Sequence, residues 1–276
     1  MVGIFPWGFG TGLRATGQVQ HGNRWRIVRP WPLAVCLSIQ DSSHQLKLRM
    51  DADQDLYFRQ IEIGPMANFV YLIGSRTVRE AVVVDPAWSI AEILGVAESD
   101  GMKVTGALVT HYHPDHVGGD FMGHHIQGLQ EFMETCAGRV YAHRAECSLL
   151  PIAASEVTPT DEHTEISVGS ISIRFIHTPG HTPGSQCFMV RGRLVSGDTL
   201  FIGSCGRTDL PGSNPGDMYD SLTRKLMALD ESTLVFPGHN YSQGMTHSSI
   251  GGEKAHNPVL GFSSKAEFLA AMGYGR

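Results

Sequence analysis

The chain has 276 residues, of which 42% are hydrophobic and 17% charged, and its formal net charge at pH 7 is -6. This composition is typical of a folded globular protein and excludes a largely disordered one, while the negative charge argues against a nucleic-acid partner. Because no stretch approaches the roughly 20 consecutive apolar residues that a membrane-spanning helix needs, we predict no membrane association.

The first 49 residues differ in composition from the rest of the chain. They carry six Lys or Arg residues and one acidic residue, Asp41, whereas residues 50–276 carry 15 basic and 26 acidic residues. The segment is rich in Gly, Pro, Trp and Arg and shows neither helical nor strand periodicity. We therefore predict a disordered or mis-assigned N-terminal extension over residues 1–49, with the true start at Met50, and a catalytic domain over residues 50–276.

Five cysteines are scattered along the chain without a CxxC pair: Cys36, Cys136, Cys147, Cys187 and Cys205. This odd number and wide spacing predict reduced thiols in a cytoplasmic protein rather than a disulfide framework.

From residue 59 onward, short segments rich in β-branched and aromatic residues alternate with turn residues. In the first half the pattern predicts strands at 59–64, 68–74, 80–86, 104–110 and 139–143, helices at 90–101 and 144–150, and a partly helical segment at 121–138. In the second half it predicts strands at 171–177, 185–192, 193–198 and 232–238 and a helix at 217–229. Two series of strands, each with its own helices, indicate an α/β protein with two sheets packed face to face and helices outside.

The segment LVTHYHPDHVGGD (108–120) concentrates residues that bind metals. His111 and His113 are two residues apart at the end of a predicted strand, so the strand period of two places both imidazoles on one face. Asp115 and His116 follow where the chain turns into the next element, so all four side chains can converge. Imidazole nitrogen and carboxylate oxygen suit zinc, iron or manganese.

Three later segments share one pattern, in which a strand is followed by a Gly or Pro turn and a possible ligand. They are HTPGHTPGS with His181, LVSGDTLF with Asp198 and VFPGHNYS with His239. The whole set can hold two metal ions: one bound by His111, His113 and His181, the other by Asp115, His116 and His239, with Asp198 bridging. A hydroxide shared by two such ions is a nucleophile at neutral pH, and one ion can polarise the carbonyl that it attacks.

With these residues the chain resembles the metallo-β-lactamase superfamily, whose HxHxDH motif is HYHPDH here. His181, Asp198 and His239 match the rest of that family's metal ligands in order, and the resemblance covers roughly residues 60–260. It implies a four-layer αββα sandwich and a metal site, but not a substrate, because this fold supports many chemistries.

The resemblance also narrows the chemistry. A bridging Asp in GDTLF is similar to the glyoxalase II, persulfide dioxygenase and lactonase branches, whereas related lactamases commonly have Cys there. The continuation CGRTD leans toward persulfide dioxygenases and small glyoxalase-like hydrolases. Arg207 matches an arginine near the glutathione side of the cleft, and Tyr241 matches a tyrosine that contacts the thiol carrier. The alternatives are an Arg207–Asp209 pair that only holds the loop, and a tyrosine that only packs at the rim.

Two features separate this chain from its closest likenesses. Only 37 residues follow His239, which leaves no room for the helical C-terminal domain of a full glyoxalase II; Lys254 is the one nearby candidate for a cationic clamp. A persulfide dioxygenase would bind one iron through His111, His181 and Asp198, but this chain has Pro114 where many such enzymes have Ala, and its segment from Val117 to Gly138 looks longer than theirs. Both departures favour a hydrolase.

Asp85 matches an aspartate close to the family's metal-binding loop, and we expect it to orient that backbone or a ligand imidazole. A simple turn at the strand end is the alternative. Asn68 and Tyr71 are assigned to packing.

The leading hypothesis is a hydrolase of a thioester or related acyl bond, similar to glyoxalase II, with two divalent metal ions, zinc by preference. Asp115 would bind a metal and orient the nucleophile. The substrate would be a small molecule, glutathione-linked in the closest analogy. The alternatives are a persulfide dioxygenase with one iron per chain, a lactonase, and a non-enzymatic metal-binding module.

Overall fold

The computed structural model describes residues 18–21, 24–27, 54–242 and 244–274. The chain divides into two units, Met1–Ala52 and Asp53–Arg276. The first unit contains a hairpin of β1 (Gln18–His21) and β2 (Arg24–Ile27), which the sequence pattern did not predict. The remainder of the predicted extension lies outside the described residues.

The first sheet of the second unit has six strands in the order β10-β9-β6-β5-β4-β3. The strands are β3 (Leu56–Ile63), β4 (Asn68–Ser75), β5 (Glu80–Val84), β6 (Lys103–Leu108), β9 (Arg139–His143) and β10 (Val157–Thr160). From β5 to β10 all neighbours are parallel. Their carboxyl ends therefore share one edge, which is where ligands bind in such sheets.

The second sheet also has six strands, in the order β11-β12-β13-β14-β17-β18. The strands are β11 (Glu165–Val168), β12 (Ile171–His177), β13 (Gln186–Val190), β14 (Arg193–Gly197), β17 (Leu234–Pro237) and β18 (Ser248–Ser249). β14 and β17 are parallel neighbours. Residues that follow these two strands, including Asp198 and His239, therefore leave the sheet side by side.

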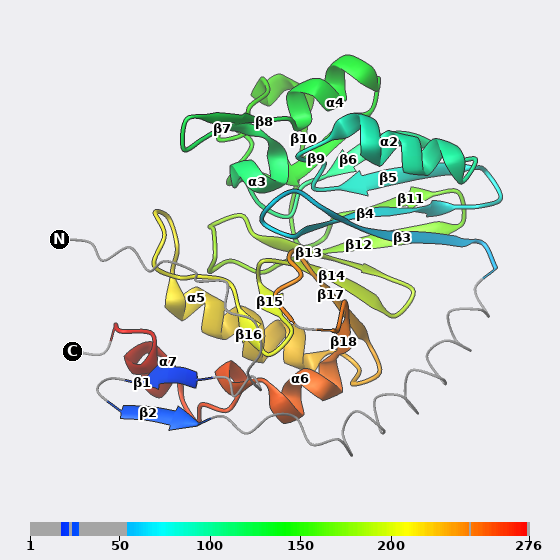
Figure 1. The fold of residues 1–276 in the computed structure, drawn as a ribbon. Coiled ribbons are helices and arrows are strands. Elements are labelled where there is room, and N and C mark those ends of the chain that lie inside the picture. The colour runs from blue at the N-terminus through cyan, green and yellow to red at the C-terminus, as the bar shows by residue number, and fades with distance from the viewer. Residues whose placement is uncertain (1–17, 22–23, 28–53, 243, 275–276) are drawn as a thin grey trace. The chain divides into compact units, whose positions relative to one another are not determined.

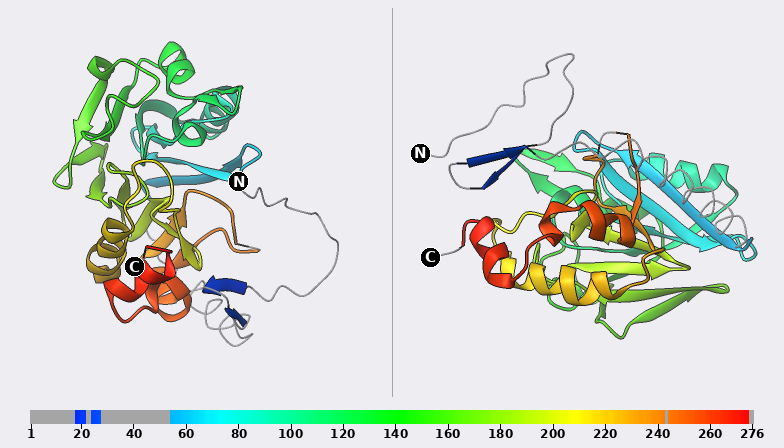
Figure 2. Two further views of the ribbon diagram at one scale, coloured as in Figure 1. Left: turned by 90° about the vertical axis from the view of Figure 1, so that its left-hand side faces the viewer. Right: turned by 90° about the horizontal axis from the view of Figure 1, so that it is seen from below.

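Helices cover the outer faces of both sheets (Figures 1 and 2). α2 (Ile90–Ser99) and α4 (Leu129–Thr135) pack in one apolar cluster with the first sheet. α5 (Pro215–Asp220), α6 (Ile250–His256) and α7 (Lys265–Ala271) pack in another with the second sheet. The predicted αββα order is confirmed. No helix in the described part of the chain is long and apolar enough to cross a membrane.

The alternation of side chains along β4 shows why the sheets stack. Val70 and Leu72 point into the cluster under the helices. Tyr71 points the other way, and its ring centroid lies 6.0 Å from that of Phe236 in the second sheet. Both faces of β4 are thus buried, which explains its nearly continuous apolar sequence.

The remaining elements are short. They are α3 (Pro114–Val117), β7 (Gly119–Phe121), β8 (His124–Ile126), β15 (Leu200–Phe201), β16 (Ser204–Cys205), a π-helical turn at Ser221–Lys225, and 3₁₀ turns at Ala154–Glu156, Leu226–Ala228 and Pro258–Leu260. The π-helical turn Ser221–Lys225 and the 3₁₀ turn Leu226–Ala228 extend α5, so the predicted helix at 217–229 exists but is irregular.

Three parts of the secondary-structure prediction were wrong or incomplete. Residues 144–150 form turns instead of a helix, because their backbone bonds join Glu146 to His143 and Leu149 to Glu146, three residues apart. The segment 121–138 begins as the second half of a β7–β8 hairpin, with Met122 and Gly123 at positive φ in its turn. The edge strand β10 was not predicted because it contains Pro159, which is tolerated at an edge.

Candidate metal centre

The loop that carries HYHPDH begins two residues earlier than the sequence pattern predicted, because the strand expected to reach Thr110 ends at Leu108. β6 ends at Leu108, so His111 and His113 lie in the loop beyond the strand, and Asp115 and His116 lie in α3. The side chain of Asp85 holds this loop: its Oδ1 accepts from the Thr110 N–H at 2.7 Å and its Oδ2 from the Thr110 hydroxyl at 2.6 Å. The convergence of the ligands therefore comes from loop anchoring and not from strand period.

The second sheet supplies the other three candidate ligands from its loops. His181 lies between β12 and β13, Asp198 follows β14 and His239 follows β17. Glycines allow this approach: a Cβ on Gly197 would lie 2.7 Å from Thr110 Cβ, and one on Gly238 would lie 2.3 Å from Asp198 Oδ1. The glycines before Asp198 and His239 are thus needed for the two loops to meet the HYHPDH loop.

The seven predicted ligands form two groups of three with one residue between them. In the first group, His181 Nε2 lies 3.0 Å from His113 Nδ1, and His111 completes the group. In the second group, Asp115 Oδ2 lies 3.3 Å from both His116 Nε2 and His239 Nε2. Asp198 Oδ2 lies 3.6 Å from His181 Nε2 and 3.4 Å from His239 Nε2, so this carboxylate faces both groups.

The outward nitrogens of four imidazoles have hydrogen-bond acceptors that set the ring tautomers. His181 Nδ1 donates to Arg207 O at 2.8 Å, His239 Nδ1 to Met66 O at 3.0 Å, and His116 Nδ1 to Asp85 Oδ2 at 3.0 Å. His111 Nδ1 lies 3.0 Å from the Thr110 hydroxyl, whose own proton goes to Asp85. Each ring therefore directs an Nε2 lone pair inward, the form that binds metals.

Two inward ligand atoms lack a hydrogen-bond partner within the described part of the protein. His111 Nε2 and Asp198 Oδ1 are buried without a hydrogen bond. Burying unpaired polar atoms is costly, and two ring nitrogens 3.0 Å apart require either a shared proton or a cation beside them. Divalent cations fit this set of nitrogen and oxygen donors, and zinc, iron and manganese all accept it.

The electrostatics of the cluster favour a cation. Burial lowers the pKa of His111 well below its usual value, and burial together with the neighbouring imidazoles lowers the pKa of His113 to about 4. Burial opposes the charged form of His239, but the Asp198 and Asp115 carboxylates raise its pKa to about 9. Against the effect of burial, nearby imidazoles hold the pKa of Asp198 well below its usual range. The carboxylates of Asp115 and Asp198 are thus ionised and can bind a cation.

A cleft of about 420 Å³ opens beside the ligands, and its lining includes both predicted substrate residues. The Arg207 guanidinium is engaged by Asp209, with Nε to Oδ1 at 2.9 Å and Nη2 to Oδ2 at 3.0 Å. Tyr241 stacks on His239, with ring centroids 4.6 Å apart and planes at 10°, and is 58% exposed. Lys254 instead contacts Glu231, with its Nζ 3.2 Å from Oε1.

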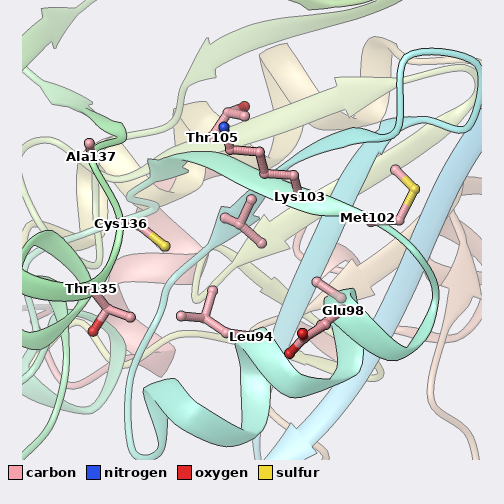
Figure 3. A pocket seen from close by; sticks show the side chains of 10 residues that line it. Leu94, Glu98, Met102, Lys103, Thr105, Thr135, Cys136 and Ala137 are labelled. Carbon is pink, nitrogen blue, oxygen red and sulfur yellow. The ribbon is translucent and has the colours of Figure 1, made fainter.

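A second cavity of about 350 Å³ lies away from this cleft, between α2, the start of β6 and the end of α4 (Figure 3). Leu94, Glu98, Met102, Lys103 and Cys136 are among its lining residues. None of the seven candidate ligands lines it.

Sequence reasoning assigned Asn68 to packing, but its side chain supports the cluster. Asn68 Nδ2 donates to Asp115 Oδ2 at 3.0 Å and to Asp115 O at 3.1 Å, and its Oδ1 accepts from the Trp88 indole N–H at 2.9 Å. A polar residue at the start of the apolar strand 68–74 was the available signal.

Glu146 was also missed, and it acts on the same loop as His177. Glu146 Oε1 accepts from the Gly184 N–H at 2.7 Å, and His177 Nε2 donates to Pro183 O at 2.9 Å. The two side chains hold both polar groups of the peptide bond between Pro183 and Gly184, close to His181. No sequence pattern marks Glu146 as a partner of that loop.

Comparison with known proteins agrees with this geometry. The sequence model of the metallo-beta-lactamase superfamily matches residues 63–239. A hydroxyacylglutathione hydrolase from Rhodospirillum rubrum is 37% identical over 179 residues, which are 64% of this chain and 63% of that enzyme. A probable polyketide biosynthesis zinc-dependent hydrolase from Bacillus subtilis is 28% identical over 202 residues, which are 73% of this chain and 85% of that protein. The crystal structure of ETHE1 from Myxococcus xanthus is similar, with a TM-score of 0.69 and 31% sequence identity over 79% of this chain and 90% of that chain.

Proposed function

Because the chain belongs to the metallo-beta-lactamase superfamily, we propose that it is a metal-dependent hydrolase of a thioester or related acyl bond, similar to hydroxyacylglutathione hydrolase. Water adds to the carbonyl carbon, the carbon–sulfur bond breaks, and the products are a carboxylic acid and a thiol. The observation that carries this proposal is the place of Asp198, whose Oδ2 faces His181 at 3.6 Å and His239 at 3.4 Å. A carboxylate between two complete ligand groups suits a pair of cations.

In this proposal the seven candidate ligands bind two metal ions. His111, His113 and His181 would hold one ion, Asp115, His116 and His239 would hold the other, and Asp198 would contribute to both. When bound, divalent cations lower the pKa of a water molecule and polarise a carbonyl; zinc is our choice because the Bacillus subtilis relative is described as zinc-dependent.

Asp115 has the further task of orienting the nucleophile. Asp115 is buried, with 7% of the residue exposed, and its Oδ2 accepts a hydrogen bond from Asn68 Nδ2 at 3.0 Å. An acceptor held in this way can direct the proton of an attacking water without itself moving. The cleft residues beside it then orient the acyl group toward the same point.

Replacing Asp198 with Ala tests the proposal. We expect the zinc content of the variant to fall below two ions per chain and thioesterase kcat/KM to fall by at least about 100-fold, since even supporting residues of metal sites contribute 10–100-fold. The exposed Asp217→Ala variant is the matched control. Unaltered zinc content and thioesterase rate in Asp198→Ala would overturn the two-ion site.

The segment CGRTD (205–209), which is similar to persulfide dioxygenases, supports a second candidate, a persulfide dioxygenase with one iron. His111, His181 and Asp198 would be its ligands, and two imidazoles with one carboxylate leave positions open for oxygen and sulfur. This candidate predicts one iron per chain and oxygen uptake with glutathione persulfide. An iron-loaded protein that consumes no oxygen with this substrate removes it.

A further inference from the structure

The wall of the cleft is mostly apolar beyond the ligands. Among its described lining residues other than the ligands, Arg207 alone carries a formal charge, and the others are Met66, Tyr112, Pro114, Phe121, Phe201, Leu210, Pro211 and Tyr241. Phe121 comes from the β7–β8 hairpin and Phe201 from β15, so both halves of the fold contribute to this wall. Such a surface favours burial of methylene groups over burial of charged ones.

The Arg207 guanidinium already has a carboxylate partner within the chain, so a substrate carboxylate would have to displace that partner. Its Nε and Nη2 both bind the Asp209 carboxylate, at 2.9 and 3.0 Å, in the paired geometry that an arginine uses for an anionic ligand. The two side chains are 66% and 61% exposed, so the bond itself is weak in water. Because Asp209 is two residues away in the chain, however, it competes with any external carboxylate at all substrate concentrations.

Backbone contacts keep this loop in place. The carbonyl of Arg207 accepts from His181 Nδ1 at 2.8 Å, and that of Thr208 accepts from the Tyr274 hydroxyl at 2.5 Å. The carbonyl of Pro211 accepts from the Tyr112 hydroxyl at 3.3 Å. These bonds hold the backbone of the loop, so Asp209 stays within reach of Arg207 and the cleft offers the same paired, neutral wall before the substrate arrives.

From these observations we propose that the substrate is a thioester with an apolar acyl chain and an uncharged thiol carrier, and not a glutathione conjugate. This inference rests on the proposed thioester hydrolase function and adds the substrate class to it. The acyl chain packs against the apolar wall. Asp209 neutralises the positive charge of Arg207, so this charge does not attract the carboxylates of glutathione.

Two thioesters with the same acyl group provide the test. We expect the zinc-loaded full chain to hydrolyse S-hexanoyl-N-acetylcysteamine with kcat/KM at least about tenfold above that for S-hexanoylglutathione, which corresponds to about 1.4 kcal/mol. Lengthening the acyl group from butanoyl to hexanoyl should raise kcat/KM by up to about fourfold per methylene. Equal or better hydrolysis of the glutathione thioester overturns the proposal.

The Asp209→Asn variant tests the charge argument. Loss of the carboxylate frees Arg207, so KM for S-hexanoylglutathione should fall about fivefold more than KM for the N-acetylcysteamine thioester. Adding Arg207→Gln to this variant should abolish the difference. Glu231→Gln, which removes an exposed acid paired with Lys254, is the matched control. An unchanged KM ratio in Asp209→Asn shows that the pair does not govern the choice of carrier.

Binding of non-hydrolysable thioethers separates this inference from the proposed function. By calorimetry, S-hexyl-N-acetylcysteamine should bind the zinc-loaded protein more tightly than S-hexylglutathione. If neither thioester is hydrolysed, the proposed function fails, and the thioether preference still decides the substrate class. If S-hexylglutathione binds as tightly or more tightly, the inference fails even where thioesters are hydrolysed.

Discussion

Asp85 controls the orientation of two candidate ligands through one buried carboxylate. It accepts hydrogen bonds from the Thr110 N–H, the Thr110 hydroxyl and His116 Nδ1, and that hydroxyl lies 3.0 Å from His111 Nδ1. Its φ of +53° lies in the left-handed region, which Asp and Asn tolerate better than most residues. Position 85 therefore requires a short side chain with two oxygen atoms that both accept hydrogen bonds.

The Asp85→Asn variant keeps the size and the φ preference but replaces one acceptor with a donor. We expect zinc affinity to fall about 10–100-fold and the metal-free protein to lose about 1–3 kcal/mol of unfolding free energy. Chelator competition and urea unfolding measure the two effects, with the exposed Asp217→Asn as control. Unchanged zinc affinity would show that Asp85 serves the turn only.

Trp88 acts on the cluster through Asn68. Because its indole N–H donates to Asn68 Oδ1 at 2.9 Å, the amide must turn its Nδ2 toward Asp115. In Trp88→Phe we expect a loss of about 1 kcal/mol in unfolding free energy and a fall in thioesterase kcat that exceeds any change in KM. The control is Tyr57→Phe, which removes the hydrogen bond from the Tyr57 hydroxyl to Asp100. This variant should change the unfolding free energy and leave the kinetics unchanged. Identical kinetics in both variants would contradict this role for Trp88.

At the scale of elements, the turns at 144–150 replace the predicted helix because Glu146 has a tertiary partner. Its Oε1 binds the Gly184 N–H at 2.7 Å, while His177 binds Pro183 O. A buried acid that satisfies the loop of His181 outweighs the weak helical preference of a seven-residue segment. The connection after β9 thus supports the loop between β12 and β13.

Glu146 also gives the fold a distinctive pH dependence. Burial raises its pKa from 4.5 to about 7, so between these values the folded state holds a proton that the unfolded chain has released. Stability contributed by this proton is complete below pH 4.5 and is lost as pH rises through about 7. Relative to Glu146→Gln, the wild-type protein should therefore lose roughly 3 kcal/mol across this window.

Urea unfolding of the two metal-free proteins at several pH values measures this difference. Metal-free protein is used because the ligands themselves titrate. Glu156→Gln, an exposed acid of the 3₁₀ turn before β10, serves as control and should follow the wild-type curve. Parallel wild-type and Glu146→Gln curves would contradict the prediction.

For the whole molecule, the metal centre joins the two halves of the sandwich. Four candidate ligands follow β6 of the first sheet and three lie in loops of the second. Ions bound across this boundary stabilise the fold, by about 4 kcal/mol for each ion at free metal 1,000-fold above Kd. We expect chelation to lower the melting temperature and added zinc to restore it, as scanning calorimetry would show. A melting temperature independent of zinc would exclude a site that joins the sheets.

The metal ligands and most strands of this protein could be predicted from its sequence, because both are marked by local patterns of residue type and spacing. HYHPDH, and His181, Asp198 and His239 after their Gly or Pro turns, are marked by residue type and short spacing. The strands of the two sheets are marked by apolar segments bounded by turns, and the αββα fold follows from their order.

Contacts between distant segments were not predictable in this way. The pairs Trp88–Asn68, Asn68–Asp115 and Glu146–Gly184 each join residues at least 20 positions apart. The neutral cleft wall likewise depends on how closely the β7–β8 hairpin and the loop after β14 approach each other. Side-chain type and spacing select the metal ligands, because metal coordination depends on donor atoms, whereas their orientation and the substrate surface depend on packing that brings remote segments together.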